Sequence, residues 1–116
     1  MKIFLFLSFG FMAPFTGAQT LPDRLVCVSW MNQTTRIFET QLSEYAMAQL
    51  TGSEGNEWVF EADVMEGSLN YVSLRHVPSD VVTVSRAAAI PLYRLSSELN
   101  VGTEKATVDC SLRRTP

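Results

Sequence analysis

The two cysteines, Cys27 and Cys110, are the residues of this chain best suited to covalent chemistry. They are its only cysteines, so a single intramolecular pairing exists. In an exported chain such a pair forms a disulfide, and closing a loop of about 80 residues stabilises a fold by roughly 4 kcal/mol in the chain-entropy model. Zinc is the alternative, but two thiols and one histidine fall short of a closed four-ligand site. We therefore predict a Cys27–Cys110 disulfide and no metal site.

His76 is the only histidine, and histidine is the usual acid–base group near neutral pH. A catalytic set could be assembled from His76, a serine and Asp80. The sequence nevertheless contains no Gly-x-Ser-x-Gly, no His-x-x-x-His and no glycine-rich phosphate loop. We expect His76 to be a surface or strand-end residue, and we predict no catalytic residue and no cofactor.

A run of acids could in principle do chemistry, because paired carboxylates hydrolyse glycosides or bind calcium. An alternating pattern already places three of these acids on the wet face of one strand, and a calcium-loop signature is absent. We interpret the run as a solvated face, with a surface for a cation or a basic partner as the alternative. The acids are Glu54, Glu57, Glu61, Asp63 and Glu66.

Two further patterns concern recognition. Asn32-Gln33-Thr34 is an N-glycosylation triplet on a predicted turn, which matters only in a host that glycosylates exported proteins. Trp30, Tyr45, Tyr71 and Tyr93 could form a binding face, since amphipathic aromatic residues anchor interfaces. We expect these aromatic residues to complete a small core instead, so the sequence assigns no binding site.

The main pattern along the chain is an alternation of apolar and polar residues, which is typical of half-buried strands. In residues 57–64, Trp58, Phe60, Ala62 and Val64 share one face, and Glu57, Glu61 and Asp63 lie on the other. Near the C-terminus, Ala106, Val108, Cys110 and Leu112 are predicted to face a core, with Lys105, Thr107, Asp109, Ser111 and Arg113 facing water.

Four other segments are rich in strand-forming residues, namely 24–31, 35–42, 68–77 and 81–86. Turn-type stretches separate the strands at 32–34, 52–56, 66–68, 77–80 and 100–103. Many short strands with turns between them, and no long helices, predict an antiparallel arrangement.

Two segments fit the strand pattern less well. Residues 42–52 also fit a short helix, with Ser43 capping its start and Gly52 its end, and we favour a strand because the hairpin rhythm continues through them. Residues 87–95 contain Pro91, which cannot donate to a ladder, so an edge strand, a bulge or a bend is expected there.

These elements predict an all-β fold: a single small antiparallel β-sandwich or a closed β-barrel of about six to eight strands. The first and last strands would be neighbours tied by Cys27–Cys110, and this closure would remove an exposed sheet edge. No internal repeat or linker divides the chain, so residues 19–116 are expected to form one domain.

The N-terminal residues 1–18 have the order of a secretory signal peptide. Lys2 precedes an apolar run from Ile3 to Phe15, and small residues end at Ala18. The run is shorter than the roughly 20 apolar residues of a membrane-spanning helix. No cysteine comes directly after the expected cut, the first being Cys27, so we do not expect lipidation. We predict export to the periplasm or the extracellular space, with a mature chain that starts near Gln19.

The net charge limits the classes of partner that we expect. The chain has a net charge of −3, and because Lys2 is the only charged residue of the first 18, the mature part carries −4. This mild acidity gives no reason to expect nucleic acid or a membrane surface as a partner. The leading hypothesis is a non-enzymatic exported β-domain that binds a macromolecule, such as a protein outside the cytoplasm.

A sharper form of this hypothesis is an inhibitor of a secreted hydrolase, with loops 52–56 and 96–103 presented to the enzyme. A β-barrel carrier of a small apolar ligand is the alternative, and a small exported hydrolase is a further one. The host type and the oligomeric state stay open.

Overall fold

The computed structural model describes residues 21–115, and the predicted signal peptide lies outside them. The described residues form eight strands and no helix: β2 (Arg24–Met31), β3 (Thr34–Gln41), β4 (Ala48–Glu54), β5 (Trp58–Met65), β6 (Ser68–His76), β7 (Val81–Arg86), β8 (Arg94–Val101) and β9 (Glu104–Arg113). The predicted all-β class is confirmed. Within these residues no helix is long and apolar enough to cross a membrane.

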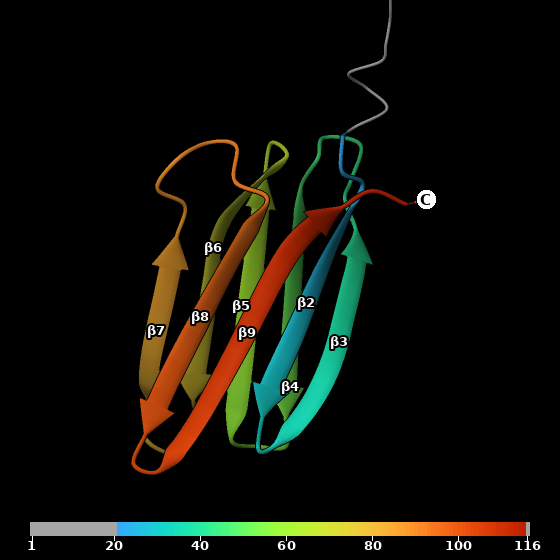
Figure 1. Ribbon diagram of the computed structural model, residues 1–116. Helices are drawn as coiled ribbons and strands as arrows, with labels where there is room; N and C mark the ends of the chain where they lie inside the picture. Colours follow the sequence, from blue (N-terminus) through green and yellow to red (C-terminus); the bar gives the residue numbers. More distant parts are fainter. Residues whose placement is uncertain (1–20, 116) are drawn as a thin grey trace, which may run out of the picture.

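The strands form two antiparallel four-stranded sheets (Figure 1). We call β3-β2-β9-β8 the bridge sheet, because it holds the disulfide, and β4-β5-β6-β7 the meander sheet. Four hairpin turns lie at one end of the molecule, the hairpin end; they are residues 32–33, 55–57, 77–80 and 102–103. The opposite end, the crossover end, holds residues 42–47, 66–67 and 87–93 and both ends of the described chain.

The disulfide joins the first and last described strands, as predicted. Cys27 and Cys110 are direct partners in the β2–β9 ladder, with α-carbons 4.0 Å apart, and both are fully buried. The predicted removal of a sheet edge is wrong, however. β2 and β9 are the two inner strands of the bridge sheet, whose edges are β3 and β8. The bridge therefore fastens the centre of a sheet.

No closed barrel forms in the described chain, although the strands follow one another around the molecule in sequence order. The ladders stop at two seams, between β3 and β4 and between β7 and β8. Side chains cross each seam. Arg36 of β3 pairs with Glu54 of β4, and Ser97 Oγ of β8 lies 2.9 Å from Ser85 Oγ of β7.

The core lies between the two sheets and contains the predicted inward faces of β5 and β9. Trp58, Phe60, Ala62 and Val64 are at most 1% exposed. Gly52 lies opposite Phe60 in the β4–β5 ladder, and a Cβ there would come within 2.2 Å of the Phe60 ring. Gly52 thus belongs to a strand because the ring needs its space, and it ends no helix.

Several segment predictions are corrected. Residues 42–47 form a loop, in which Ser43 Oγ accepts hydrogen bonds from the Tyr45 and Met47 amides, and only Ala48–Glu54 is a strand. Residues 87–93 form the second crossover, the bend expected around Pro91. Residues 96–101 belong to β8, so the predicted loop at 96–103 shrinks to a turn at 102–103.

Candidate functional site

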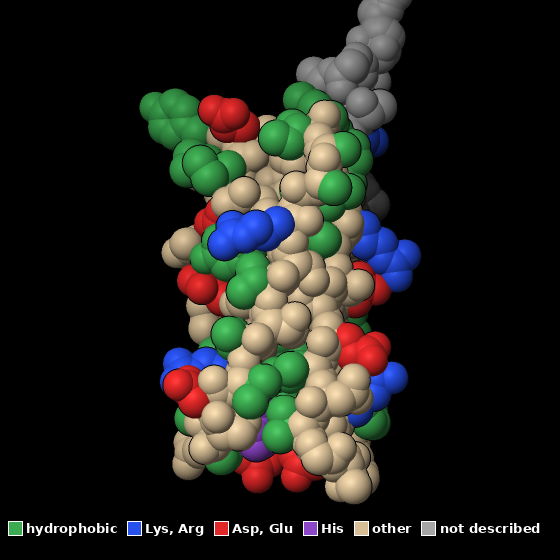
Figure 2. All heavy atoms as spheres, turned by 90° about the vertical axis from the view of Figure 1, so that its left-hand side faces the viewer, with side chains coloured by type: hydrophobic (Ala, Val, Ile, Leu, Met, Phe, Trp, Pro, Cys, Tyr) green, Lys and Arg blue, Asp and Glu red, His purple; other side chains and the backbone are tan. Residues whose placement is uncertain are grey.

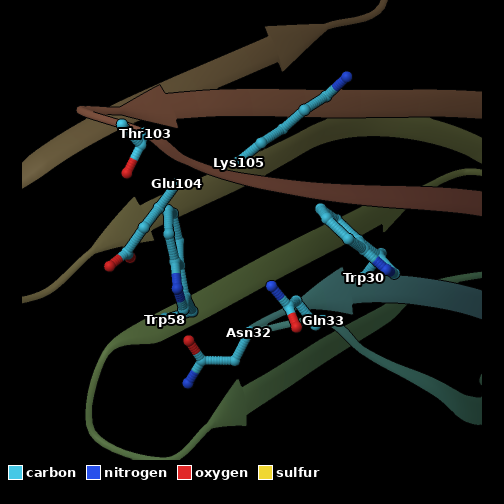
Figure 3. Close-up of a pocket in the computed structure, with 7 residues that line it drawn as sticks. All are labelled: Trp30, Asn32, Gln33, Trp58, Thr103, Glu104 and Lys105. Carbon is cyan, nitrogen blue, oxygen red and sulfur yellow. The ribbon is translucent and has the colours of Figure 1, made fainter.

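Two surfaces stand out, one at each end of the molecule. The first is a pocket of about 440 Å³ at the hairpin end, which we call the notch. The β2–β9 ladder ends at the pair Trp30–Thr107, and beyond it the β2–β3 and β8–β9 hairpins diverge. The notch opens between them. Its residues are Trp30, Asn32 and Gln33 from one hairpin, Thr103, Glu104 and Lys105 from the other, and Trp58 from β5 (Figure 3).

Trp58 forms the floor of the notch. Its ring is 1% exposed and lies between Glu104 and Asn32 (Figure 3). The buried Nε1 has no hydrogen-bond partner among the described residues. A buried donor without an acceptor costs roughly 1–3 kcal/mol. A group that brought an acceptor to this nitrogen would recover part of that cost.

The rim of the notch is held by the backbone of a tight turn. Asn32 and Gln33 both have positive φ, 55° and 58°. Two such residues in succession form the type I′ turn that matches the twist of a two-residue hairpin. Both side chains are exposed, so the turn presents two amides next to the half-exposed ring of Trp30.

His76 lies behind the notch and is the last residue of β6. It is 8% exposed and its ring centroid is 4.6 Å from that of Trp58. Its Nδ1 lies 2.7 Å from Ser79 Oγ, and its Nε2 lies 3.8 Å from Glu104 Oε1. The expectation of a strand-end position is confirmed, and the expectation of a surface position is not.

The catalytic set assembled from the sequence is only partly brought together. Ser79 contacts His76, but Asp80 turns away and pairs with Arg75 at 2.8 Å. The His76–Ser79 contact joins residues three apart and closes the turn 77–80. Because the imidazole packs against the Trp58 ring at a tilt of 55° and is mostly buried, we assign it a structural role.

The acids of the run 54–66 do not converge. Glu54 pairs with Arg36 at the hairpin end, and Glu66 lies in the turn at the crossover end. Asp63, expected on a wet face, is 8% exposed because Gln49 and Asn70 donate to its two oxygens at 3.2 and 2.9 Å. Among the described residues, no group of three or more acids, histidines and cysteines could hold a metal ion.

The second surface lies at the crossover end. It consists of large apolar side chains on three segments, and we call it the apolar apex: Tyr45 (73% exposed), Met47 (44%), Met65 (48%) and Ile90 (84%). Hydrogen bonds tie the segments together. The Gly67 amide donates to the Ala46 carbonyl at 2.9 Å, and the Leu92 amide donates to Ser68 Oγ at 2.8 Å.

Figure 2 shows hydrophobic side chains and an acidic group gathered at the top of the molecule, where the crossovers lie. Glu44 and Glu66 are exposed in these segments, and neither forms an ion pair with another described residue. The prediction that the aromatic residues complete the core is wrong for Tyr45, Tyr93 and Trp30, which are 73%, 47% and 39% exposed.

Neither surface was assigned from the sequence. The notch joins Trp30 and Trp58 from different sheets, and no sequence pattern brings them together. The sequence contained one weak indication of the apex, because Tyr45, Met47 and Ile90 lie in the two segments that fitted the strand pattern poorly.

No protein-family model matches the sequence, and comparison with curated proteins and with solved structures gives no match.

Proposed function

We propose that the chain is an exported, non-enzymatic binding domain that holds a basic protein partner outside the cytoplasm through the apolar apex. The observation that carries the proposal is the exposure of Tyr45, Met47, Met65 and Ile90 on three segments joined by hydrogen bonds. Grouped exposed apolar side chains mark interaction sites, and tyrosine and methionine are enriched in protein interfaces.

Two further features support a protein as the occupant. The hydrogen bonds between the three segments hold the apex in shape before binding, which lowers the entropic cost of association. Glu44 and Glu66 border the apolar side chains and would favour a partner with lysine or arginine around an apolar centre. An inhibitor of a secreted hydrolase is the sharper form, and in that form the crossovers, rather than the turns at 55–57 and 102–103, are presented to the enzyme.

The alternatives have less support. A carrier needs space between the sheets, but that layer is filled by fully buried side chains such as Trp58, Phe60 and Leu74. A hydrolase needs a presented base, whereas His76 is packed against Trp58.

Site-specific photo-crosslinking tests the proposal. A benzophenone amino acid replaces Ile90 in the apex, and in a matched control it replaces Ile37, which is 70% exposed on β3. In the extracytoplasmic fraction of the source cells we expect a saturable protein adduct at position 90 and none at position 37. Unlabelled native protein should abolish the adduct, and the double variant Tyr45→Ser/Ile90→Ser should not. Equal adducts at both positions, or equal competition by the double variant, would refute the proposal.

A further inference from the structure

We propose that the notch at the hairpin end binds a terminal sugar ring of a neutral oligosaccharide, independently of the apolar apex. The two tryptophans of the chain both line this one pocket. The negative face of an indole attracts the weakly positive C–H groups on the face of a pyranose ring. Trp30, which is 39% exposed, offers such a face at the rim.

The polar groups of the notch suit sugar hydroxyls. The side-chain amides of Asn32 and Gln33 and the hydroxyl of Thr103 form no hydrogen bond with another described residue. Thr34 donates to Asn32, but to its backbone carbonyl. Amides both donate and accept, as hydroxyl groups do, so adjacent hydroxyls on a ring can pair with them. The carboxylate of Glu104 adds an acceptor on the opposite wall.

The floor supplies an independent observation. Trp58 Nε1 is buried and lacks an acceptor within the described chain, and its ring is positioned between Glu104 and Asn32 (Figure 3). A sugar hydroxyl that enters beside Asn32 would accept this hydrogen bond. The ligand would thus satisfy a donor that the fold leaves unsatisfied, which favours the bound state.

Charge and size define the class of sugar. The carboxylate of Glu104 faces the notch, whereas the Lys105 side chain extends away from it (Figure 3) and its Nζ lies 3.6 Å from Glu98 Oε2. The negative charge of Glu104 would repel an acidic sugar, so a neutral ligand is favoured. The volume of about 440 Å³ lies near the lower end of the range for ligand pockets. It suits the end of a chain better than a long stretch of one.

The test follows the indole N–H of Trp58 by ¹H–¹⁵N NMR. The mature protein is made in a host that does not N-glycosylate, so that Asn32 carries no glycan, and is titrated with maltotetraose, cellotetraose and chitotetraose. We expect at least one of them to shift the Trp58 indole resonance saturably. Trp30→Ala should raise the Kd at least tenfold and Gln33→Ala severalfold. Ile37→Ala, at a more exposed position (70%, against 39% for Trp30) that does not line the notch, should leave the Kd unchanged.

Two outcomes would overturn the inference. One is an indole resonance that none of the three sugars moves at millimolar concentration. The other is a Trp30→Ala variant that binds as tightly as the native protein. Because Trp30 is partly exposed, its replacement should leave the fold intact, which the unchanged dispersion of the spectrum would verify.

Discussion

Phe60 and Glu61 are neighbours on β5 whose side chains point to opposite faces of the meander sheet. Phe60 is fully buried between the sheets and packs edge-on against Phe38, with ring centroids 5.0 Å apart. Glu61 is only partly covered, on the outer face. Two adjacent residues of one strand are therefore expected to contribute very differently to the free energy of unfolding.

We predict that Phe60→Ala lowers the free energy of unfolding by about 3–5 kcal/mol, because the buried ring is lost and leaves a cavity. Glu61→Ala should change it by less than about 0.5 kcal/mol, since this position makes no buried contact of similar size. Urea unfolding of both variants measures the difference. Equal losses would show that the assignment of the two faces is wrong.

At the scale of single residues the sequence predicted the inward faces of β5 and β9 correctly, because large apolar residues alternate there without interruption. It failed where a polar residue is buried. Ser97 on β8 is 4% exposed because its hydroxyl bonds to the Val72 carbonyl and lies 2.9 Å from Ser85 Oγ. A serine at a core position breaks the alternation, so residues 96–101 were predicted as a loop.

At the scale of the elements, the two seams decide how the sheets are held together. Across the β3–β4 seam, Arg36 donates to Glu54, and this hydrogen bond, more than the accompanying charge attraction, lowers the pKa of the Glu54 carboxyl. The same pair raises the pKa of Arg36. A carboxyl with a lowered pKa in the folded state stabilises the fold above its unfolded pKa of about 4.3, and that contribution is lost as the pH falls through the folded value.

We therefore predict that Glu54→Gln is less stable than the native protein at pH 7 and that the gap narrows as the pH falls below about 4. Arg36→Gln should show the same narrowing, because it removes the same pair. Thermal unfolding of the three proteins across this pH range provides the measurement. A gap that stays constant with pH would mean that the pair does not contribute to the seam.

The existence and order of most strands could be predicted because hairpin turns separate them, but the seams could not. Whether a ring of strands closes or opens depends on packing, such as the Phe60 ring that occupies the space beside Gly52. The loop at 42–47 was not predicted, and the reason lies in its local hydrogen bonds. Ser43 bonds to the amides of Tyr45 and Met47, much as a helix cap would, while the chain turns into the next sheet.

At the scale of the whole molecule, the disulfide and the two ends define the architecture. The bridge joins residues 83 apart in sequence, so it restricts nearly the whole unfolded domain, and we expect it to contribute about 4 kcal/mol. Both ends of the described chain leave at the crossover end, next to the segments that carry the apolar apex (Figure 1). The proposed partner surface and the proposed sugar site would then lie at opposite ends of one domain.

Every part of this account depends on an oxidised domain outside the cytoplasm, and the intact mass of the protein recovered there is the most direct test. We predict a chain that lacks Met1–Ala18 and begins at or near Gln19, lighter by the mass of two hydrogen atoms than the same chain after reduction, which corresponds to the Cys27–Cys110 bridge. Recovery of the chain with residues 1–18 retained, or with two free thiols that react with an alkylating agent without denaturant, would contradict the account.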